Sequence, residues 1–339
     1  MTDRGETVVV AGAAGFLGRA AVRAFVRRGH RVLGLVRRPA QAEAVRRDGA
    51  EPVVGDLLAP DSWEGSLAGA SIVVHAAANP SDASGEDDPR IAAVRIAGGR
   101  SLARIAARRG ARRLVVVSGY WVYPDAAETR TEEAPIDPVG EARTNRETEL
   151  AVEAELRGTP VDHPVVRPGM VYGTGAWLPP IARALAGRRY AVIDGGQNPW
   201  SFVSRDDAGE AIATVGAAAG PVPPVLTVVD DRPVPWGTFV GSLARRLGLP
   251  PPRSVSRAEG IRLYGETIAR QLSARRAFLA PRLRSLGWRP LDPSVEEGLA
   301  RILGRAEAAG IDPLAGDLYD GEPIRSGNRP SDTAAKSAR

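Results

Sequence analysis

Short apolar runs alternate with longer amphipathic stretches along the first half of the chain. Runs of β-branched and apolar residues are typical of buried strands, and apolar positions three and four residues apart are typical of helices. Six strands are predicted, at Thr7–Ala11, Arg31–Val36, Val53–Val54, Ser71–Ala77, Leu114–Ser118 and Val165–Arg167. The clearest helical periodicity covers Arg19–Arg28, Ile91–Arg109 and Arg143–Arg157. This alternation predicts an α/β fold, a doubly wound parallel sheet with helices on both faces.

The pattern changes after residue 167, where prolines and glycines become frequent. It predicts strands at Tyr190–Ile193 and Val225–Val229 and helices at Pro235–Leu247, Arg257–Arg270 and Ser294–Glu307. We expect residues 1–167 to form the core domain and 168–320 to form mainly a smaller lobe with excursions back to the core. Residues 321–339 are polar and rich in breakers, which predicts a disordered tail. Asn79–Pro89 is predicted to be a loop beside the cleft, and Pro250–Leu279 a lid over it.

Composition excludes several classes of function. The net charge is only +5, and the arginines are spread along the chain without interleaved aromatic residues, which argues against a nucleic-acid partner. No apolar run approaches the roughly 18 residues of a membrane span, and the short polar N-terminus does not resemble a signal peptide, so a cytoplasmic location is expected. The absence of cysteine and the wide separation of His30, His75 and His163 argue against a metal site.

A glycine motif follows the first predicted strand directly. Gly12, Gly15 and Gly18 stand three residues apart between that strand and the first helix. The first glycine permits a tight turn, the second lets the backbone approach a pyrophosphate, and the third lets helix and strand pack closely. A flexible turn is the alternative, but the strand–turn–helix context favours a dinucleotide site that also includes Ala14, Phe16 and Leu17.

The end of the second strand indicates which dinucleotide binds. NAD sites usually carry an acid there, which holds the ribose 2′-hydroxyl. This chain instead has Arg37 and Arg38, and two guanidinium groups suit a 2′-phosphate. The alternative is two solvated arginines in an arginine-rich chain. We interpret the pair as an NADP(H) signal.

These motifs and several others resemble the extended or atypical short-chain dehydrogenase/reductase superfamily, in its NAD-dependent epimerase/dehydratase group. The resemblance covers roughly residues 7 to 305. The matching segments are the glycine motif, Gly55-Asp-Leu57, Val74-His-Ala-Ala-Ala78, Ser118-Gly-Tyr-Trp-Val-Tyr123, Arg167-Pro-Gly-Met-Val-Tyr-Gly173, Phe202-Val-Ser-Arg-Asp-Asp207 and Leu286-Gly-Trp-Arg-Pro290. The family implies a seven-stranded Rossmann-type sheet with a small C-terminal substrate lobe.

The resemblance also implies further cofactor contacts. Asp56 and Leu57 would meet the adenine. The ends of the fourth and fifth strands would contribute Ala76, Ala77, Ala78 and Val117. The nicotinamide would be flanked by Pro168, Gly169, Met170 and Val171.

The family's usual proton relay is missing. Members generally use a Tyr-x-x-x-Lys pair with a Ser or Thr and an Asn. Carried over position by position, the tyrosine falls at Glu141, the lysine at Asn145, the Ser/Thr at Gly119 and the Asn at Arg95. The sole lysine of the chain is Lys336, so no Tyr-x-x-x-Lys motif exists in it.

Three functions remain open on these residues. In the first, the chain is an NADPH-dependent ketoreductase whose proton comes from water, from Ser118, Tyr120 or Tyr123, or from a hydroxyl of the substrate. In the second, Glu141 is the general base of an isomerase, dehydratase or cyclase that retains its nucleotide. In the third, the chain is a non-catalytic NADP(H) sensor.

Aromatic residues in the segments that the family places around its cleft favour the first function. They are Trp121, Trp177, Tyr190, Trp200 and Tyr264. Such side chains would stack on a flat apolar ligand, although ordinary core packing is the alternative for them. The expected substrate is therefore a bulky, aromatic, polyketide-type ketone, and the expected assembly is a monomer or homodimer. The arginine bias is typical of a GC-rich genome. In lacking the usual tyrosine, the chain also resembles the atypical ketoreductases of angucyclinone antibiotic pathways, such as that of simocyclinone.

Overall fold

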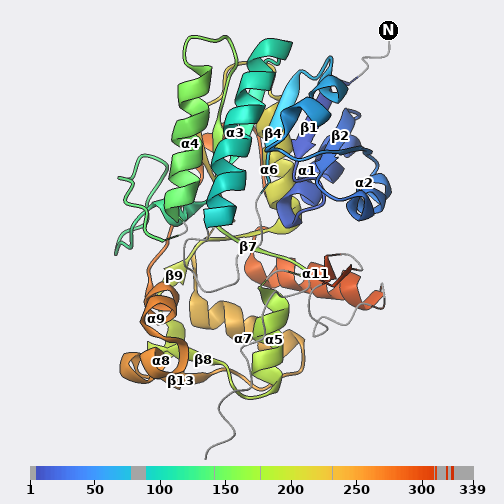
Figure 1. Ribbon diagram of the computed structural model, residues 1–339. Coiled ribbons are helices and arrows are strands. Elements are labelled where there is room, and N and C mark those ends of the chain that lie inside the picture. The colour runs from blue at the N-terminus through green and yellow to red at the C-terminus, as the bar shows by residue number, and fades with distance from the viewer. Residues whose placement is uncertain are drawn as a thin grey trace, which may run out of the picture.

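The computed structural model describes residues 5–77, 89–140, 142–175, 177–230, 232–308 and 310, and the backbone of the short paired strands β14 (Leu318–Tyr319) and β15 (Glu322–Pro323). A seven-stranded parallel sheet forms the centre of one half of the molecule (Figure 1). Its order is β11-β6-β5-β4-β1-β2-β3, which confirms the predicted Rossmann-type fold. The strands are β1 (Thr7–Ala11), β2 (Arg31–Val36), β3 (Glu51–Val54), β4 (Ile72–His75), β5 (Arg113–Val117), β6 (Val165–Pro168) and β11 (Val225–Val228).

Helices cover both faces of this sheet because its central strands are apolar on both sides. In β1, Val8 and Val10 join the core beneath one helical layer, whereas Val9 and Ala11 join the core beneath the other. The first layer contains α1 (Phe16–Arg27), α2 (Ala42–Arg47) and α6 (Arg205–Ala217). The second contains α3 (Pro89–Arg109) and α4 (Ala142–Leu156), which pack side by side (Figure 1).

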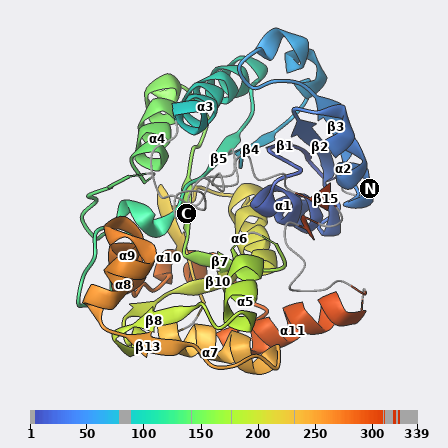
Figure 2. The same ribbon diagram turned by 60° about the horizontal axis from the view of Figure 1, so that its bottom comes forward.

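A smaller lobe lies against one end of the sheet (Figure 2). It contains the two-stranded pairs β7 (Met170–Tyr172) with β10 (Phe202–Ser204), β8 (Ala191–Ile193) with β13 (Arg253–Val255), and β9 (Pro199–Trp200) with β12 (Val234–Pro235). Its helices are α5 (Leu178–Ala186), α7 (Trp236–Arg246), α8 (Arg257–Tyr264), α9 (Glu266–Ser273) and α11 (Val295–Ala308). The short helix α10 (Pro281–Ser285) returns to the sheet and contacts β11.

The single helix predicted over Arg257–Arg270 is wrong. The segment forms two helices, α8 and α9, that meet at Gly265. Gly265 has φ +77° and ψ 161°, a conformation outside the helical region that favours glycine. The amphipathic pattern continues through this position, and so periodicity alone concealed the break.

Candidate active site

The glycine motif forms a tight turn between β1 and α1. Gly12 has φ +82°, and a Cβ atom built on it would lie 2.6 Å from the Ala77 Cα atom. A Cβ atom on Gly18 would lie 2.0 Å from the Gly12 carbonyl oxygen, so neither position accepts a side chain. On Gly15 a Cβ atom would meet only the Gly12 carbonyl oxygen, at 3.1 Å. The backbone at Gly15 is therefore open on its outer side, where a ligand can approach it.

This turn lies at the point where the strand order of the sheet reverses. β1 has β2 on one side and β4 on the other, and the carboxyl ends of β1 and β4 meet at the glycine motif. The amide of Ala76 donates to the Ala11 carbonyl oxygen at 3.0 Å, which fixes the end of β4 beside the turn. Helix α1 begins at Phe16 without a side-chain cap, and a helix N-terminus of this kind favours binding of an anion in the crevice. These residues fit a dinucleotide pyrophosphate. Ala78 lies outside the described residues.

The predicted adenosine end of the site is on the surface. Arg37 and Arg38 are exposed immediately after β2, and the Arg38 amide donates to the Gln41 side chain. Asp56 is also exposed, and its carboxylate accepts a hydrogen bond from the Leu58 amide at 2.9 Å. Leu57, in contrast, is buried in the core beneath α3. Its packing is sufficient to explain its position.

A buried ion pair, which the sequence did not reveal, lies behind the carboxyl ends of β5 and β6. The Arg167 guanidinium donates to both oxygens of the Glu149 carboxylate, at 2.9 and 2.6 Å, and both side chains are 1% exposed. Ser118 donates its hydroxyl proton to Glu149 at 2.5 Å, and Arg146 donates to the other oxygen at 2.9 Å. The Ser118 hydroxyl proton is thus committed to a carboxylate. A charged residue inside the apolar run Val165–Arg167 was the available signal.

The two candidate tyrosines are fully buried. The Tyr123 hydroxyl donates to the Glu132 carbonyl oxygen at 3.0 Å and accepts from Arg167 at 2.8 Å. Tyr120 packs edge-on against Trp121 and Phe278. Burial raises the pKa of both phenols, which makes them poorer acids than an exposed tyrosine. Their geometry is that of core residues.

The positions of the missing relay hold different groups. Asn145 lies on α4 near Gly119. A Cβ atom built on Gly119 would lie 3.4 Å from the side-chain nitrogen of Asn145. The Arg95 guanidinium donates to the Val117 carbonyl oxygen at 3.1 Å. His75 Nε2 lies 2.9 Å from the Arg95 carbonyl oxygen, and burial lowers the pKa of this imidazole to about 4. Glu141 lies outside the described residues.

The segment predicted to flank the nicotinamide joins the sheet to the lobe. Gly169 donates its amide to the Val228 carbonyl oxygen, and a Cβ atom on it would lie 2.4 Å from the Ser201 carbonyl oxygen. Pro168 is buried at the end of β6, whereas Met170 and Val171 are partly exposed. Met170 and Val171 can therefore contact a ligand at this edge of the sheet.

Two of the five aromatic residues predicted to line the cleft pack in the lobe core instead. Trp200 and Tyr190 are buried, and Trp200 stacks against Trp236 with ring centroids 4.5 Å apart. Tyr264 is half-buried and donates to the Ala191 carbonyl oxygen. Trp200 and Tyr190 pack there together with the aliphatic side chains of the lobe core. Trp121 and Trp177 remain partly exposed.

Among the helices of the described part of the chain, none combines the length and apolarity of a bilayer span. The His, Asp and Glu side chains of that part form no group of three or more that could hold a metal ion.

Two reductases are similar to this chain in sequence. A 3-diazoavenalumate denitrifying reductase from a Streptomyces species is 34% identical over 314 residues, which cover 87% of this chain and 99% of that protein. A 4-hydroxy-2-methyl-3-oxo-4-farnesyl-3,4-dihydroquinoline-1-oxide ketoreductase from Stigmatella aurantiaca is 29% identical over 249 residues, which cover 71% of this chain and 73% of that protein.

Solved structures show the same fold at lower identity. A UDP-glucose 4-epimerase from Thermotoga maritima superposes with a TM-score of 0.74 at 18% identity, over 89% of this chain and 99% of that one. A dTDP-glucose 4,6-dehydratase from Streptomyces venezuelae, solved with NAD bound, gives 0.72 at 22% identity, over 91% and 99%. Residues 8–228 match the family model described as "NAD dependent epimerase/dehydratase family". The match extends over most of the chain and includes the whole glycine turn, so the chain belongs to the NAD-dependent epimerase/dehydratase family.

Proposed function

We propose that the protein is an NADPH-dependent reductase that acts on a bulky aromatic substrate without a tyrosine–lysine proton relay. The observation that carries this proposal is an intact dinucleotide turn beside a site whose relay positions hold Gly119, Asn145 and Arg95. Both reductase names among the relatives support hydride transfer. When bound, NADPH supplies the hydride.

The protein's own part in this reaction is to bind and orient. The turn at Gly12–Gly18 holds the pyrophosphate, and Met170 and Val171 border the nicotinamide. Trp121 is partly exposed, and its indole would contact an aromatic substrate. Holding the reacting atoms in place supplies a large part of the rate of such a reaction.

A ketone substrate must then obtain its proton from elsewhere, because the hydroxyls of Ser118 and Tyr123 are engaged in the buried network. A hydroxyl group next to the carbonyl of a quinone or phenolic ketone can supply it, as can water. This requirement favours hydroxylated aromatic ketones over simple aliphatic ones.

A diazo compound is a second candidate substrate, favoured by the name of the Streptomyces relative. Transfer of a hydride to the ring carbon of an aryl diazonium ion would form a carbon–hydrogen bond and break the carbon–nitrogen bond, with release of dinitrogen and formation of the arene. The positive charge of the diazonium ion balances the hydride, so no proton is required. This reaction therefore explains the missing relay without a substitute donor.

One assay separates the candidates. NADPH oxidation is followed at the nicotinamide absorbance with a panel of hydroxylated aromatic ketones, quinones and aryl diazonium ions, and released dinitrogen is measured by mass spectrometry. Turnover with a ketone supports the first substrate class, and turnover with stoichiometric dinitrogen supports the second. Tight NADPH binding without consumption on any member would contradict the reductase and favour an isomerase using Glu141, or a sensor.

The choice of NADPH has its own test. Replacing Arg37 and Arg38 by alanine is expected to weaken NADPH binding about tenfold or more, because two charge-assisted contacts to the 2′-phosphate are lost. NADH binding should change much less. Equal losses for both cofactors, measured by calorimetry, would reject the 2′-phosphate assignment.

A further inference from the structure

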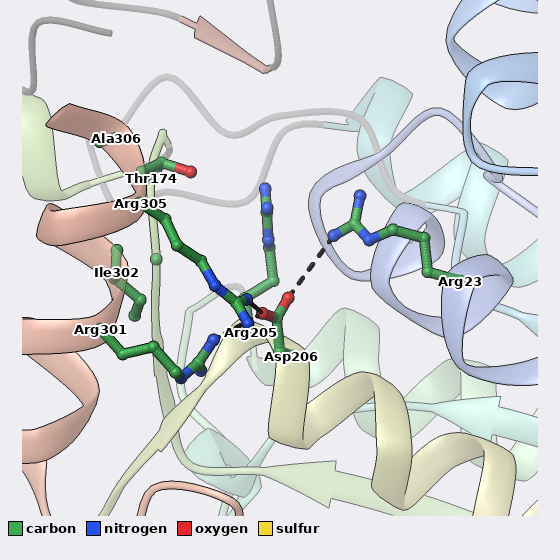
Figure 3. Close-up of a pocket in the computed structure, with 9 residues that line it drawn as sticks. Arg23, Thr174, Arg205, Asp206, Arg301, Ile302, Arg305 and Ala306 are labelled. Atoms are coloured by element: carbon green, nitrogen blue, oxygen red, sulfur yellow. Dashed lines mark hydrogen bonds and ion pairs between the residues drawn. The ribbon is translucent and has the colours of Figure 1, made fainter. Parts of the chain in front are cut away.

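Arginines that lie close together in this protein are paired with carboxylates. In the cluster between α1, α6 and α11, Asp206 accepts hydrogen bonds from Arg301 at 2.9 Å and from Arg305 at 3.0 Å (Figure 3). Arg301 also donates to the Asp292 carboxylate at 2.8 Å. These pairs balance the charge of the cluster within the protein itself, so the cluster is not where an anionic ligand is needed.

Arg276 differs from these paired arginines. It is only 6% exposed, and its Nη1 atom donates to the Tyr123 carbonyl oxygen at 2.9 Å. Within the described residues it forms no ion pair with a carboxylate, and its Nε atom is buried without a hydrogen-bond partner. Burial lowers the pKa of this guanidinium from its ordinary value, but an arginine in a protein remains protonated. The described part of the chain therefore buries this positive charge without a counter-ion, which is costly.

The open side of the Arg276 guanidinium is the edge formed by Nε and Nη2. Neither atom makes a hydrogen bond within the described residues. Elsewhere in the chain the same edge binds both oxygens of one carboxylate, in the pairs Arg19 with Asp48, Arg31 with Glu51, Arg104 with Glu155, Arg112 with Glu6 and Arg167 with Glu149. The open edge of Arg276 is therefore suited to a carboxylate.

Arg276 lies beside the residues that the proposed function assigns to the substrate and the nicotinamide. Its guanidinium carbon is 4.4 Å from the centre of the Trp121 ring, and Trp121 is partly exposed. Ser201 donates its amide to the Arg276 carbonyl oxygen at 2.9 Å and accepts from the Met170 amide at 2.9 Å. Neighbouring hydrogen-bonded segments are about 4.8 Å apart, so the backbones of Arg276 and Met170 are roughly 10 Å apart. A small aromatic acid spans such a distance.

We propose that Arg276 binds a carboxylate of the aromatic substrate, at the end opposite the carbon that receives the hydride. This assignment rests on the proposed function for the reacting end and adds a negative charge at the other end. The carboxylate would accept two parallel hydrogen bonds from Nε and Nη2 and neutralise the buried charge. The aromatic body of the substrate would lie beside Trp121. A neutral compound of the same shape leaves the charge uncompensated and should bind more weakly.

Calorimetry with the full-length protein tests this assignment without turnover. The aromatic acid 2-naphthoate and its neutral amide, 2-naphthamide, are titrated without nucleotide and again with saturating NADP⁺. We expect 2-naphthoate to bind about tenfold or more tightly than the amide, and Arg276→Gln to remove this preference. Arg276→Lys keeps the charge but lacks the paired edge, so it should retain only part of the preference. Neither compound is reduced, so the outcome is independent of whether the protein is a reductase.

Arg275→Gln is the matched control, because Arg275 adjoins Arg276 in the chain but is exposed. It should keep the full preference for 2-naphthoate. The melting temperature is a second readout: since the Arg276 charge lacks a counter-ion among the described residues, Arg276→Gln should melt at the same temperature as the unaltered protein or higher. Equal affinities of the two compounds for the unaltered protein, or a preference that Arg276→Gln retains, overturns the proposal. So does a preference lost equally in Arg275→Gln, which would reflect surface charge in general.

Discussion

Replacing Glu149 by glutamine leaves the Arg167 guanidinium, which is 1% exposed, without its carboxylate. An unpaired buried charge typically lowers the free energy of unfolding by about 3–5 kcal/mol. We expect Glu149→Gln to lose stability in this range, measured by urea unfolding.

Ser118→Ala removes one hydrogen bond to the Glu149 carboxylate and should lower the free energy of unfolding by only about 1 kcal/mol. It should also leave turnover nearly unchanged, and a hundredfold fall would restore Ser118 as a proton donor.

The buried His75 side chain is expected to make the free energy of unfolding depend on pH. Burial lowers its pKa from 6.5 to about 4 in the folded protein, so the unfolded chain binds the proton first as the pH falls. Stability should therefore decrease from about pH 6.5 down to pH 4, by about 2 kcal/mol between pH 7 and pH 5. Urea unfolding at the two pH values measures this difference. His75→Gln should remove most of it, and a variant with the same pH dependence would exclude His75 as the cause.

The sequence predicted some of these residues and missed others for a physical reason. The glycine turn is encoded locally, by three glycines between a strand and a helix, and so its position could be predicted. The pairing of Glu149 with Arg167 depends on how α4 packs against β6, which no local pattern specifies. Similarly, the sequence shows that Trp200 is aromatic but not whether its ring faces a cleft or a core.

At the scale of elements, the break between α8 and α9 depends on the backbone of Gly265. Nothing lies within 4 Å of a Cβ atom built on this residue, so an alanine there meets backbone strain and no steric clash. We expect Gly265→Ala to lower stability by about 1–3 kcal/mol. Gly220 is a matched control, because its Cβ atom would also meet nothing within 4 Å and its φ is not in the left-handed region. Equal effects of the two substitutions on the melting temperature would argue against strain at Gly265.

The sheet itself was predictable because each parallel strand is an apolar run between helices. The lobe was less predictable from the sequence, because its strands are only two to three residues long and pair in separate two-stranded sheets. Runs this short carry no clear periodicity. The apolar run at Val225–Val229 predicted the strand β11, but its place at the edge of the main sheet, beside β6, could be identified only from the fold.

At the scale of the whole molecule, Trp121 joins the two halves. Its indole packs against both the sheet core and the lobe core, with the Trp200 ring at 5.4 Å and the Arg276 guanidinium 4.4 Å from its centre. The glycine turn at Gly12–Gly18, which is the proposed cofactor site, belongs to the sheet half alone. A substitution at Trp121 should therefore affect packing at the junction and binding of the substrate, and leave the proposed dinucleotide site intact.

Trp121→Ala tests this division. We expect kcat/KM to fall by about a hundredfold, since an aromatic contact and the alignment of the lobe are both lost, while the NADPH dissociation constant changes less than about threefold. Trp121→Phe keeps an aromatic face and should retain most of the activity. Stopped-flow reduction and NADPH fluorescence titration provide the two measurements. A parallel loss of NADPH affinity in Trp121→Ala would mean that the lobe organises the dinucleotide site as well, because the only altered side chain lies at the junction between them.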